Sequence, residues 1–251
     1  MTEPIVRTQD LTIMFGGHTA VDQVSLDIIP HTFTSIIGPN GAGKTTFFNL
    51  LSGQLFPTSG RIIFQGQDVT AFAAHRRTRL GMGRSFQITN VFPDLTVAEN
   101  VRLAVQARAG VHYQLLRHHR QYSNFTDSAM ALLETVHLAE KAEQPASSLS
   151  HGDKRKLELA IILALEPKVL LLDEPTAGMA VEEVPVILEL LARLKAENRT
   201  ILLIEHKIEM VMSLSDTLVV LANGKLLAWG EPQHIMENEQ VQAAYLGGVT
   251  L

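Results

Sequence analysis

The stretch from Gly38 to Thr46 constrains the fold of this chain more than any other. It has the pattern G-x-x-x-x-G-K-[ST], in which glycines at positions 38, 41 and 43 precede Lys44 and Thr45. The apolar, β-branched residues 32–37 before it predict a strand, and residues 46–52 after it predict a helix that Gly53 ends. A strand, a glycine-rich loop and a helix in this order are typical of a P-loop, whose backbone N–H groups surround phosphate oxygens. A glycine-rich turn without a ligand fits this context poorly.

The residue types of this loop predict how it holds a nucleotide. Lys44 is expected to reach the β- and γ-phosphates of ATP, and the Thr45 hydroxyl is expected to bind Mg²⁺. The other positions are expected to contact ATP mainly through the backbone; they are Gly38, Pro39, Asn40, Gly41, Ala42, Gly43 and Thr46.

A second motif supports the first. Val169–Leu172 is an apolar segment that predicts a buried strand, and it is followed by Asp173 and Glu174. Beside a P-loop, Asp173 is expected to hold Mg²⁺ through water, and Glu174 is expected to polarise the attacking water. Taken alone, two acids after a strand would be read as solvated charges. The P-loop is what favours the catalytic interpretation.

Bulk composition narrows the remaining classes. The 251 residues are 46% hydrophobic and 19% charged, which suits one large or two small globular domains. A net charge of -5 gives no sign of a nucleic-acid partner, and the absence of cysteine excludes disulfides and thiol chemistry. The N-terminus lacks a signal-peptide pattern, and no apolar run reaches the length of a membrane span. We therefore expect a soluble chain that meets a membrane only through a partner.

The pattern along the chain predicts three regions. The first ~75 residues are rich in strand and turn signals, with strands expected at 5–14, 24–29, 32–37 and 61–64. Residues 96–137 have helical spacing, and residues from 169 onward follow a strand–helix–strand rhythm that implies parallel pairing. His118 and His119 could suggest a metal site, but adjacent residues of a helix point apart, so a solvated face is the preferred interpretation.

Between the two phosphate-site motifs lies Leu149-Ser150-His151-Gly152-Asp153, which opens an expected helix and resembles the signature motif of ATP-binding cassette (ABC) ATPases. Other elements of that family follow in order along the chain. They are Phe15 before Gly16-Gly17, Gln87 within Arg84-Ser85-Phe86-Gln87, the D-loop-like residues 176–180, and His206 after Ile204-Glu205. On these ordered matches the chain is identified as a member of the ABC ATPase family.

The resemblance implies an α/β fold, namely a P-loop NTPase core of the ABC ATPase type with an antiparallel β subdomain and a helical subdomain. The whole chain, 1–251, would form one ABC ATPase domain. Residues 1–87 and 168–251 would form the catalytic core with the β subdomain, and residues 88–167 would form the helical subdomain.

The resemblance also implies roles for single residues. Phe15 would stack on adenine, Gln87 would bind Mg²⁺ and take part in catalysis, and His206 would act with Glu174 as the switch histidine. Ser150 and Gly152 would face the γ-phosphate bound to a second ATPase subunit, the same or a homologous chain, so that two nucleotides lie between head-to-tail protomers.

Three residues depart from the family pattern. His151 replaces a small glycine, Asp153 replaces a glutamine, and Ala180 stands where aspartate is common. These changes leave their effect on hydrolysis open. The same variant signature, together with residues 86–100 and 244–247, resembles the subfamily that serves branched-chain amino acid and urea-type importers.

The function implied is the ATP-binding and hydrolysing subunit of an importer for branched-chain amino acids. It would be bound to membrane permease subunits at the cytoplasmic face of the inner membrane. A urea or amide importer and a lipopolysaccharide-type exporter remain alternatives, because the ATPase does not touch the cargo. An ABC ATPase acting on DNA is disfavoured because the chain has no sustained heptads, and one acting on ribosomes is disfavoured because the chain has a single cassette.

The segment after Gln87 is the expected contact with the permease. It carries Ile88, Val91, Phe92 and Leu95, and Pro93 interrupts any long helix there. In the family this region receives a short helix of the membrane subunit. Phe92 is expected to be the exposed anchor, whereas Val91 and Leu95 are as well explained by packing in the protein's own core.

Overall fold

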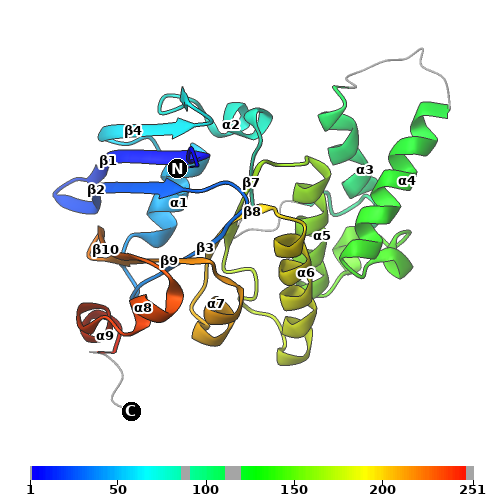
Figure 1. Cartoon of the computed structure of the whole chain (residues 1–251). Coiled ribbons are helices and arrows are strands. Elements are labelled where there is room, and N and C mark those ends of the chain that lie inside the picture. Colours follow the sequence, from blue (N-terminus) through cyan, green and yellow to red (C-terminus); the bar gives the residue numbers. More distant parts are fainter. Residues whose placement is uncertain (1, 86–90, 111–119, 247–251) are drawn as a thin grey trace. The chain divides into compact units, whose positions relative to one another are not determined.

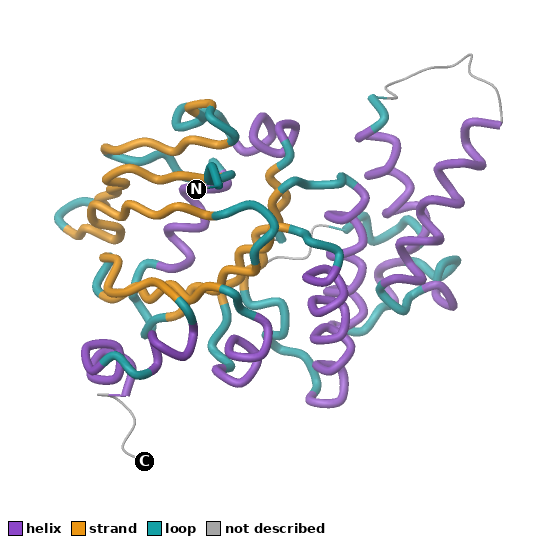
Figure 2. The backbone as a smooth tube through the Cα atoms, viewed as in Figure 1, coloured by secondary structure: helices purple, strands orange, loops and turns teal. Residues whose placement is uncertain are grey.

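The computed structural model describes residues 2–85, 91–110 and 120–246, and its chain divides into two compact units that are described separately. Unit 1 comprises Met1–Arg84, Lys168–Glu174 and Ala192–Leu251, and unit 2 comprises Ser85–Pro167 and Pro175–Leu191. Figure 2 shows that the strands gather in unit 1, whereas unit 2 is built from helices and loops.

Unit 1 contains a six-stranded sheet in the order β10-β9-β3-β8-β7-β6 (Figure 1). The strands are β3 (Phe33–Ile37), β6 (Met82–Arg84), β7 (Val169–Asp173), β8 (Thr200–Ile204), β9 (Thr217–Ala222) and β10 (Lys225–Gly230). β10 runs antiparallel to β9, and all other neighbours pair in parallel. Every residue of β3, β7 and β8 is buried, which explains their nearly continuous apolar sequences. The predicted parallel pairing of the strands at 169 and 200 is confirmed.

A second, antiparallel sheet has the order β2-β1-β4-β5. Its strands are β1 (Val6–Phe15), β2 (His18–Ile28), β4 (Ser59–Phe64) and β5 (Gln67–Asp68). The strand expected to begin at Val24 was placed too late, because β2 begins at His18. Residues 18–23 mix polar and apolar side chains without clear alternation, and their pairing with β1 across the Gly16-Gly17 turn is what extends the strand. Two further short elements, α2 (Ala74–Leu80) and β6, were not predicted.

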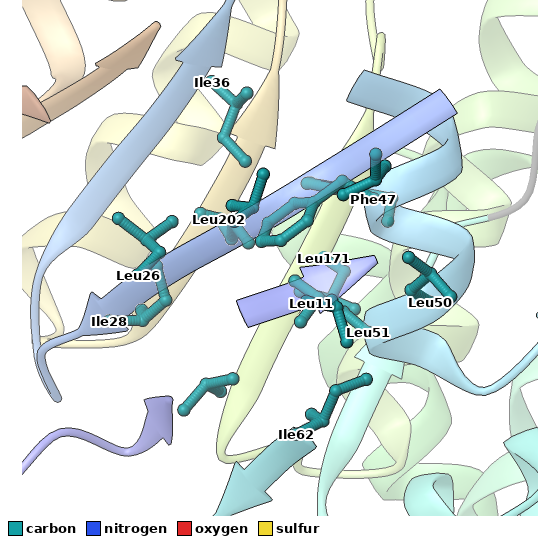
Figure 3. Close-up of a cluster of buried hydrophobic side chains, with 14 of the residues drawn as sticks. Leu11, Leu26, Ile28, Ile36, Phe47, Leu50, Leu51, Ile62, Leu171 and Leu202 are labelled. Carbon is teal, nitrogen blue, oxygen red and sulfur yellow. The ribbon is translucent and has the colours of Figure 1, made fainter. Parts of the chain in front are cut away.

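Helix α1 (Lys44–Ser52) follows the glycine loop and supplies part of the core of unit 1. Figure 3 shows Phe47, Leu50 and Leu51 of this helix among side chains of both sheets, including Leu11 and Leu202. All five side chains are essentially inaccessible to solvent. Each such burial contributes about 1.5–3 kcal/mol, so packing on two sheets fixes the direction in which the N-terminus of α1 points.

A buried arginine binds the carbonyl groups at the C-terminal end of α1. Arg77 of α2 is fully buried, and its guanidinium donates to the carbonyls of Leu50 (2.6 Å) and Leu51 (2.7 Å) in the last turn of α1. It also donates to the carbonyls of Thr70 and Phe72. Burial lowers the pKa of Arg77 to about 10, which leaves the guanidinium charged at neutral pH. A cation at a helix C-terminus complements the carbonyls that have no partner within the helix.

Unit 2 is built around helices α3 (Val97–Arg108), α4 (Arg120–Thr135) and α5 (His151–Ala164), together with η3 (Val181–Glu183) and the first part of α6 (Val184–Ala196). The helical character predicted for residues 96–137 is confirmed for the described part, which excludes 111–119. Thr96 begins α3 with a capping box: its hydroxyl accepts from the Glu99 N–H (3.1 Å), and the Glu99 carboxylate accepts from the Thr96 N–H (2.9 Å).

The C-terminal part of the chain contains a hairpin and three short helices among its described residues. Asn223 and Gly224 both have positive φ (49° and 78°) and join β9 to β10, as a two-residue hairpin requires. Helices α7 (Ile208–Leu214), α8 (Pro232–Met236) and α9 (Glu239–Leu246) complete the chain. Among the described residues, no helix combines the length and the apolar character that crossing a bilayer requires.

Candidate nucleotide site

The glycine loop lies between β3 and α1, and its shape depends on glycine. Gly38, Gly41 and Gly43 have φ values of 153°, 79° and 94°. A Cβ on Gly38 would lie 2.1 Å from the Leu221 carbonyl oxygen, and one on Gly43 would lie 2.3 Å from the Ala20 carbonyl oxygen. Close approach therefore requires glycine at both positions, whereas Gly41 meets no neighbour and is required by its φ alone.

Lys44 is buried against the loop that it follows. Its Nζ donates to the carbonyls of Gly38 (2.6 Å) and Pro39 (3.0 Å). Burial lowers the pKa of Lys44, and the nearby carboxylates of Glu174 and Asp173 act in the opposite direction. An ammonium has three N–H donors, so one remains for a further acceptor such as a phosphate oxygen.

A pocket of about 310 Å³ opens over this loop. Among the described residues, its lining lies in unit 1 and comprises His18, Ala20, residues 40–46, Glu174 and His206. The first turn of α1 holds no acidic residue, and its N-cap, Gly43, offers no side chain to the first N–H groups of the helix. The donors of a helix N-terminus thus remain available for an anion, and a buried cation stands beside them. This set of groups fits a polyphosphate.

Two catalytic candidates meet beyond the C-terminal ends of two neighbouring strands. Glu174 follows β7 and His206 follows β8, and these strands are parallel neighbours. His206 Nε2 lies 2.8 Å from Glu174 Oε1, although the two residues are 32 positions apart. The Glu174 backbone has a φ of 46° and its N–H donates to the Ile204 carbonyl (2.9 Å). Both side chains are partly exposed, 29% for Glu174 and 40% for His206, so the pair is open to water and to a ligand.

Asp173 is buried and lies beside a buried arginine. The Asp173 side chain has no solvent exposure, and its Oδ2 lies 3.5 Å from Nη2 of Arg84, which ends the adjacent strand β6. Arg84 also donates from Nη1 to the Ser52 hydroxyl (2.6 Å). Burial lowers the pKa of Arg84, while Asp173 raises it. Sequence analysis named Arg84 only as part of a motif and missed this contact; a charged residue that ends a short apolar segment was the available signal.

Phe15, the predicted adenine contact, lies outside the described lining of the pocket. Phe15 is 48% exposed at the end of β1, and it is not among the residues that line the pocket in the described part of the chain. His18, which pairs with Phe15 across the Gly16-Gly17 turn, does line it. Sequence analysis did not single out His18. Gln87, predicted for Mg²⁺ binding and catalysis, lies outside the described residues.

The signature-like residues belong to unit 2. Ser150 is the N-cap of α5, and its hydroxyl accepts from the Asp153 N–H (3.1 Å). The Asp153 carboxylate contacts Lys141 and lies 3.2 Å from Lys156 Nζ. Burial would raise the pKa of Asp153, but the two lysines outweigh it and hold the pKa below its usual value. Asp153, which departs from the family pattern, therefore has a local structural role in α5.

Comparison with known proteins agrees with this geometry. The model of the ABC transporter family matches residues 21–177. The "High-affinity branched-chain amino acid transport ATP-binding protein" LivG of Escherichia coli K12 is 40% identical, with 98% of this chain and 99% of that protein covered. BraF of Pseudomonas aeruginosa, which has the same description, is 38% identical to this chain with the same coverage. The "Lipopolysaccharide export system ATP-binding protein" LptB of Haemophilus influenzae is 30% identical, with 97% of each chain covered.

Solved structures agree on the fold. The structure of an ATP-binding cassette of an ABC transporter in its ADP conformation has a TM-score of 0.82 to this chain. It is 28% identical, with 98% of this chain and all of that chain covered. The predicted P-loop core of the ABC ATPase type is thereby confirmed.

Proposed function

The chain belongs to the ABC transporter family and hydrolyses ATP, and we propose that it is the subunit of an importer that energises the uptake of branched-chain amino acids. The observation that supports this choice of cargo is the 40% identity, over nearly the whole of both chains, to a protein named for branched-chain amino acid transport. Lipopolysaccharide export is the second candidate, and it rests on a relative of 30% identity.

We propose that the pocket over the glycine loop holds the phosphates of ATP. The N–H groups of the loop and of the first turn of α1 would surround the phosphate oxygens, and Lys44 would turn its ammonium from the loop carbonyls toward them. Thr45, Asp173 and Gln87 would hold Mg²⁺, which when bound supplies positive charge between the phosphates. The Asp173 side chain supports this assignment, because carboxylate oxygens are ligands that Mg²⁺ prefers and Asp173 ends β7 directly before Glu174 of the pocket lining.

Glu174 would accept the proton of the attacking water. Its carboxylate lies at the rim of the pocket, is reachable by solvent, and is held by His206 at 2.8 Å. The positive φ of Glu174 is a conformation that costs about 1–3 kcal/mol in a residue other than glycine, and such strain concentrates at functional sites. Phe15 would contact the adenine, and His18 would stand nearer the phosphate chain.

We further propose that unit 1 is the catalytic core and unit 2 the helical subdomain. Ser150 and Gly152 would then complete the site of a second ATPase subunit, the same or a homologous chain, and a membrane permease would bind the pair at the cytoplasmic face. The position of Ser150 as the N-cap of α5 supports this arrangement, because a helix N-terminus attracts a phosphate group. A single copy would hold ATP with only half of the catalytic groups.

The cargo is tested with the transporter assembled in membrane vesicles from this chain, its membrane permease subunits and the binding protein that delivers cargo to them. We expect leucine-loaded binding protein to stimulate ATP hydrolysis, and urea to leave the rate unchanged. Stimulation by urea or by lipopolysaccharide instead of leucine would assign the chain to the corresponding alternative transporter.

Phe92 is proposed as the anchor for the permease. Its side chain is 60% exposed, whereas Val91 and Leu95 are half-buried. The backbone that carries it is held by the buried Asn100, whose side chain accepts from the Phe92 N–H (2.8 Å) and donates to the Phe92 carbonyl (3.0 Å). An exposed aromatic on a fixed backbone loses little freedom on binding, which favours a binding hot spot.

We expect Phe92→Ala to leave ATP binding by the isolated subunit unchanged and to weaken assembly with the permease. The measurement is the yield of the complex in co-purification, followed by cargo-stimulated hydrolysis. Phe56→Ala is the matched control, because Phe56 is similarly exposed at 53%. Normal assembly and normal cargo stimulation in Phe92→Ala would exclude the anchor role, and loss of folding would point to packing within the chain.

A further inference from the structure

A carboxylate of the chain itself lies at the N-terminal end of α5. The Ser150 hydroxyl, at the N-cap of this helix, donates to Glu183 Oε1 at 3.5 Å. A Cβ added to Gly152, in the first turn, would lie 2.3 Å from Glu183 Oε2 and 2.4 Å from Oε1. Glu183 thus touches both residues that the sequence predicts to face a phosphate. A side chain at position 152 would therefore displace the Glu183 carboxylate from this place.

The local structure turns Glu183 back toward α5. Glu183 ends η3, its N–H donates to the Ala180 carbonyl (3.0 Å), and its Oε2 accepts from the Ala180 N–H (3.3 Å). Ser150, Gly152, Ala180 and Glu183 all belong to unit 2, so the contact lies within one compact unit. The segment that resembles a D-loop is thereby tied to the segment that resembles the signature motif.

No positive side chain balances this carboxylate within the described residues. The ion pairs in that part of the chain do not include Glu183, and its partners are one hydroxyl and one backbone N–H. The compensation that remains is the positive end of the α5 dipole, which attracts anions at this position. A phosphate group that approached Ser150 and Gly152 would meet a like charge in the same place.

We propose that Glu183 is an internal competitor for phosphate at the N-terminus of α5 and that it sets the ATP concentration at which two copies of the chain associate. This inference rests on the proposed function, in which Ser150 and Gly152 receive the γ-phosphate held by a second subunit. Association then requires the Glu183 carboxylate to leave the helix end or to share it with the phosphate. The contact keeps the free subunit from associating at low ATP.

The test compares three proteins that all carry Glu174→Gln, which keeps ATP from being hydrolysed during the measurement. The first has no other change, the second adds Glu183→Gln, and the third adds Glu182→Gln. Glu182 is the exposed neighbour, so its substitution makes the same change of charge without the contact. Gln retains the shape of Glu and an oxygen that can accept from the Ala180 N–H. Light scattering measures the ATP concentration of half-maximal dimer formation.

We expect Glu183→Gln to lower the ATP concentration of half-maximal dimer formation roughly three- to tenfold. The repulsion between the carboxylate and the phosphate is then removed at both nucleotide sites of a symmetric dimer. Glu182→Gln should change it by less than about twofold, since an exposed charge is screened. Raising the salt concentration should reduce the difference between the two variants in the ATP concentration of half-maximal dimer formation. Monomer affinity for a fluorescent ATP analogue should be equal in all three proteins, which checks that each is folded.

Two outcomes would overturn the inference. An unchanged or higher ATP requirement in Glu183→Gln, while the parent protein dimerises, would show that the carboxylate does not compete. Equal shifts in Glu183→Gln and Glu182→Gln would show only a general effect of net charge. A different result, in which none of the three proteins dimerises at saturating ATP although each binds it, would show that a second copy of this chain does not complete the site. The inference then fails, whereas the proposed function would stand with a homologous chain as the second subunit.

Discussion

Replacing Glu174 with glutamine is expected to reduce ATP hydrolysis by on the order of 10²-fold or more while leaving ATP bound. An amide cannot accept the proton of the attacking water, so the chemical step loses its base. The glutamine still reaches His206, because it keeps an oxygen where Oε1 now lies 2.8 Å from Nε2. The effect should therefore fall on the turnover rate and not on the fold or on the affinity for ATP.

Phosphate release under saturating ATP measures the rate of hydrolysis, and equilibrium binding of a fluorescent ATP analogue measures the affinity for ATP. Because nucleotide bound between subunits stabilises their association by mass action, the Glu174→Gln protein should also gain mass when ATP is added. Glu182→Gln is the control for loss of one carboxylate from this part of the chain. Normal turnover in Glu174→Gln would rule out the general-base role.

Replacing Lys44 with alanine is expected to abolish tight ATP binding, lowering affinity by on the order of 10²-fold or more. The ammonium is buried beside the glycine loop, where water screens its charge weakly, and Lys44 is the one lysine or arginine among the described residues that line the pocket. Its removal leaves the phosphates without the cationic side chain that pairs with them in the glycine loop. The loop itself should keep its shape, because its turns depend on Gly38 and Gly43 and not on the lysine.

Titration with the same fluorescent ATP analogue measures this loss. Lys225→Ala is the matched control: it removes the same charge from a side chain that is 68% exposed and pairs with Asp22. Thermal unfolding without nucleotide should be similar for both variants. If Lys44→Ala bound ATP with the affinity of the unchanged protein, the phosphate-binding role of Lys44 would be wrong.

Local patterns of residues are enough to predict those parts of the site that lie close together along the chain. A run of β-branched residues, three glycines at fixed spacing and a short amphipathic segment specify a strand, a loop and a helix through interactions that reach only a few residues along the chain. The same holds for the apolar strand that ends in Asp173 and Glu174, and for the hairpin at Asn223-Gly224. These features follow from dihedral preferences and periodicity, so they can be predicted without knowledge of the fold.

Contacts between residues far apart in the chain follow from strand order and packing in the folded protein. Glu174 and His206 come together because β7 and β8 are neighbours in a parallel sheet, and Arg84 reaches Asp173 because β6 pairs with β7. The place of His18 in the pocket and of Glu183 at the end of α5 depends likewise on contacts between segments far apart in the chain. The order of strands in a sheet is fixed by the packing of the whole core, and no local pattern of the sequence records it.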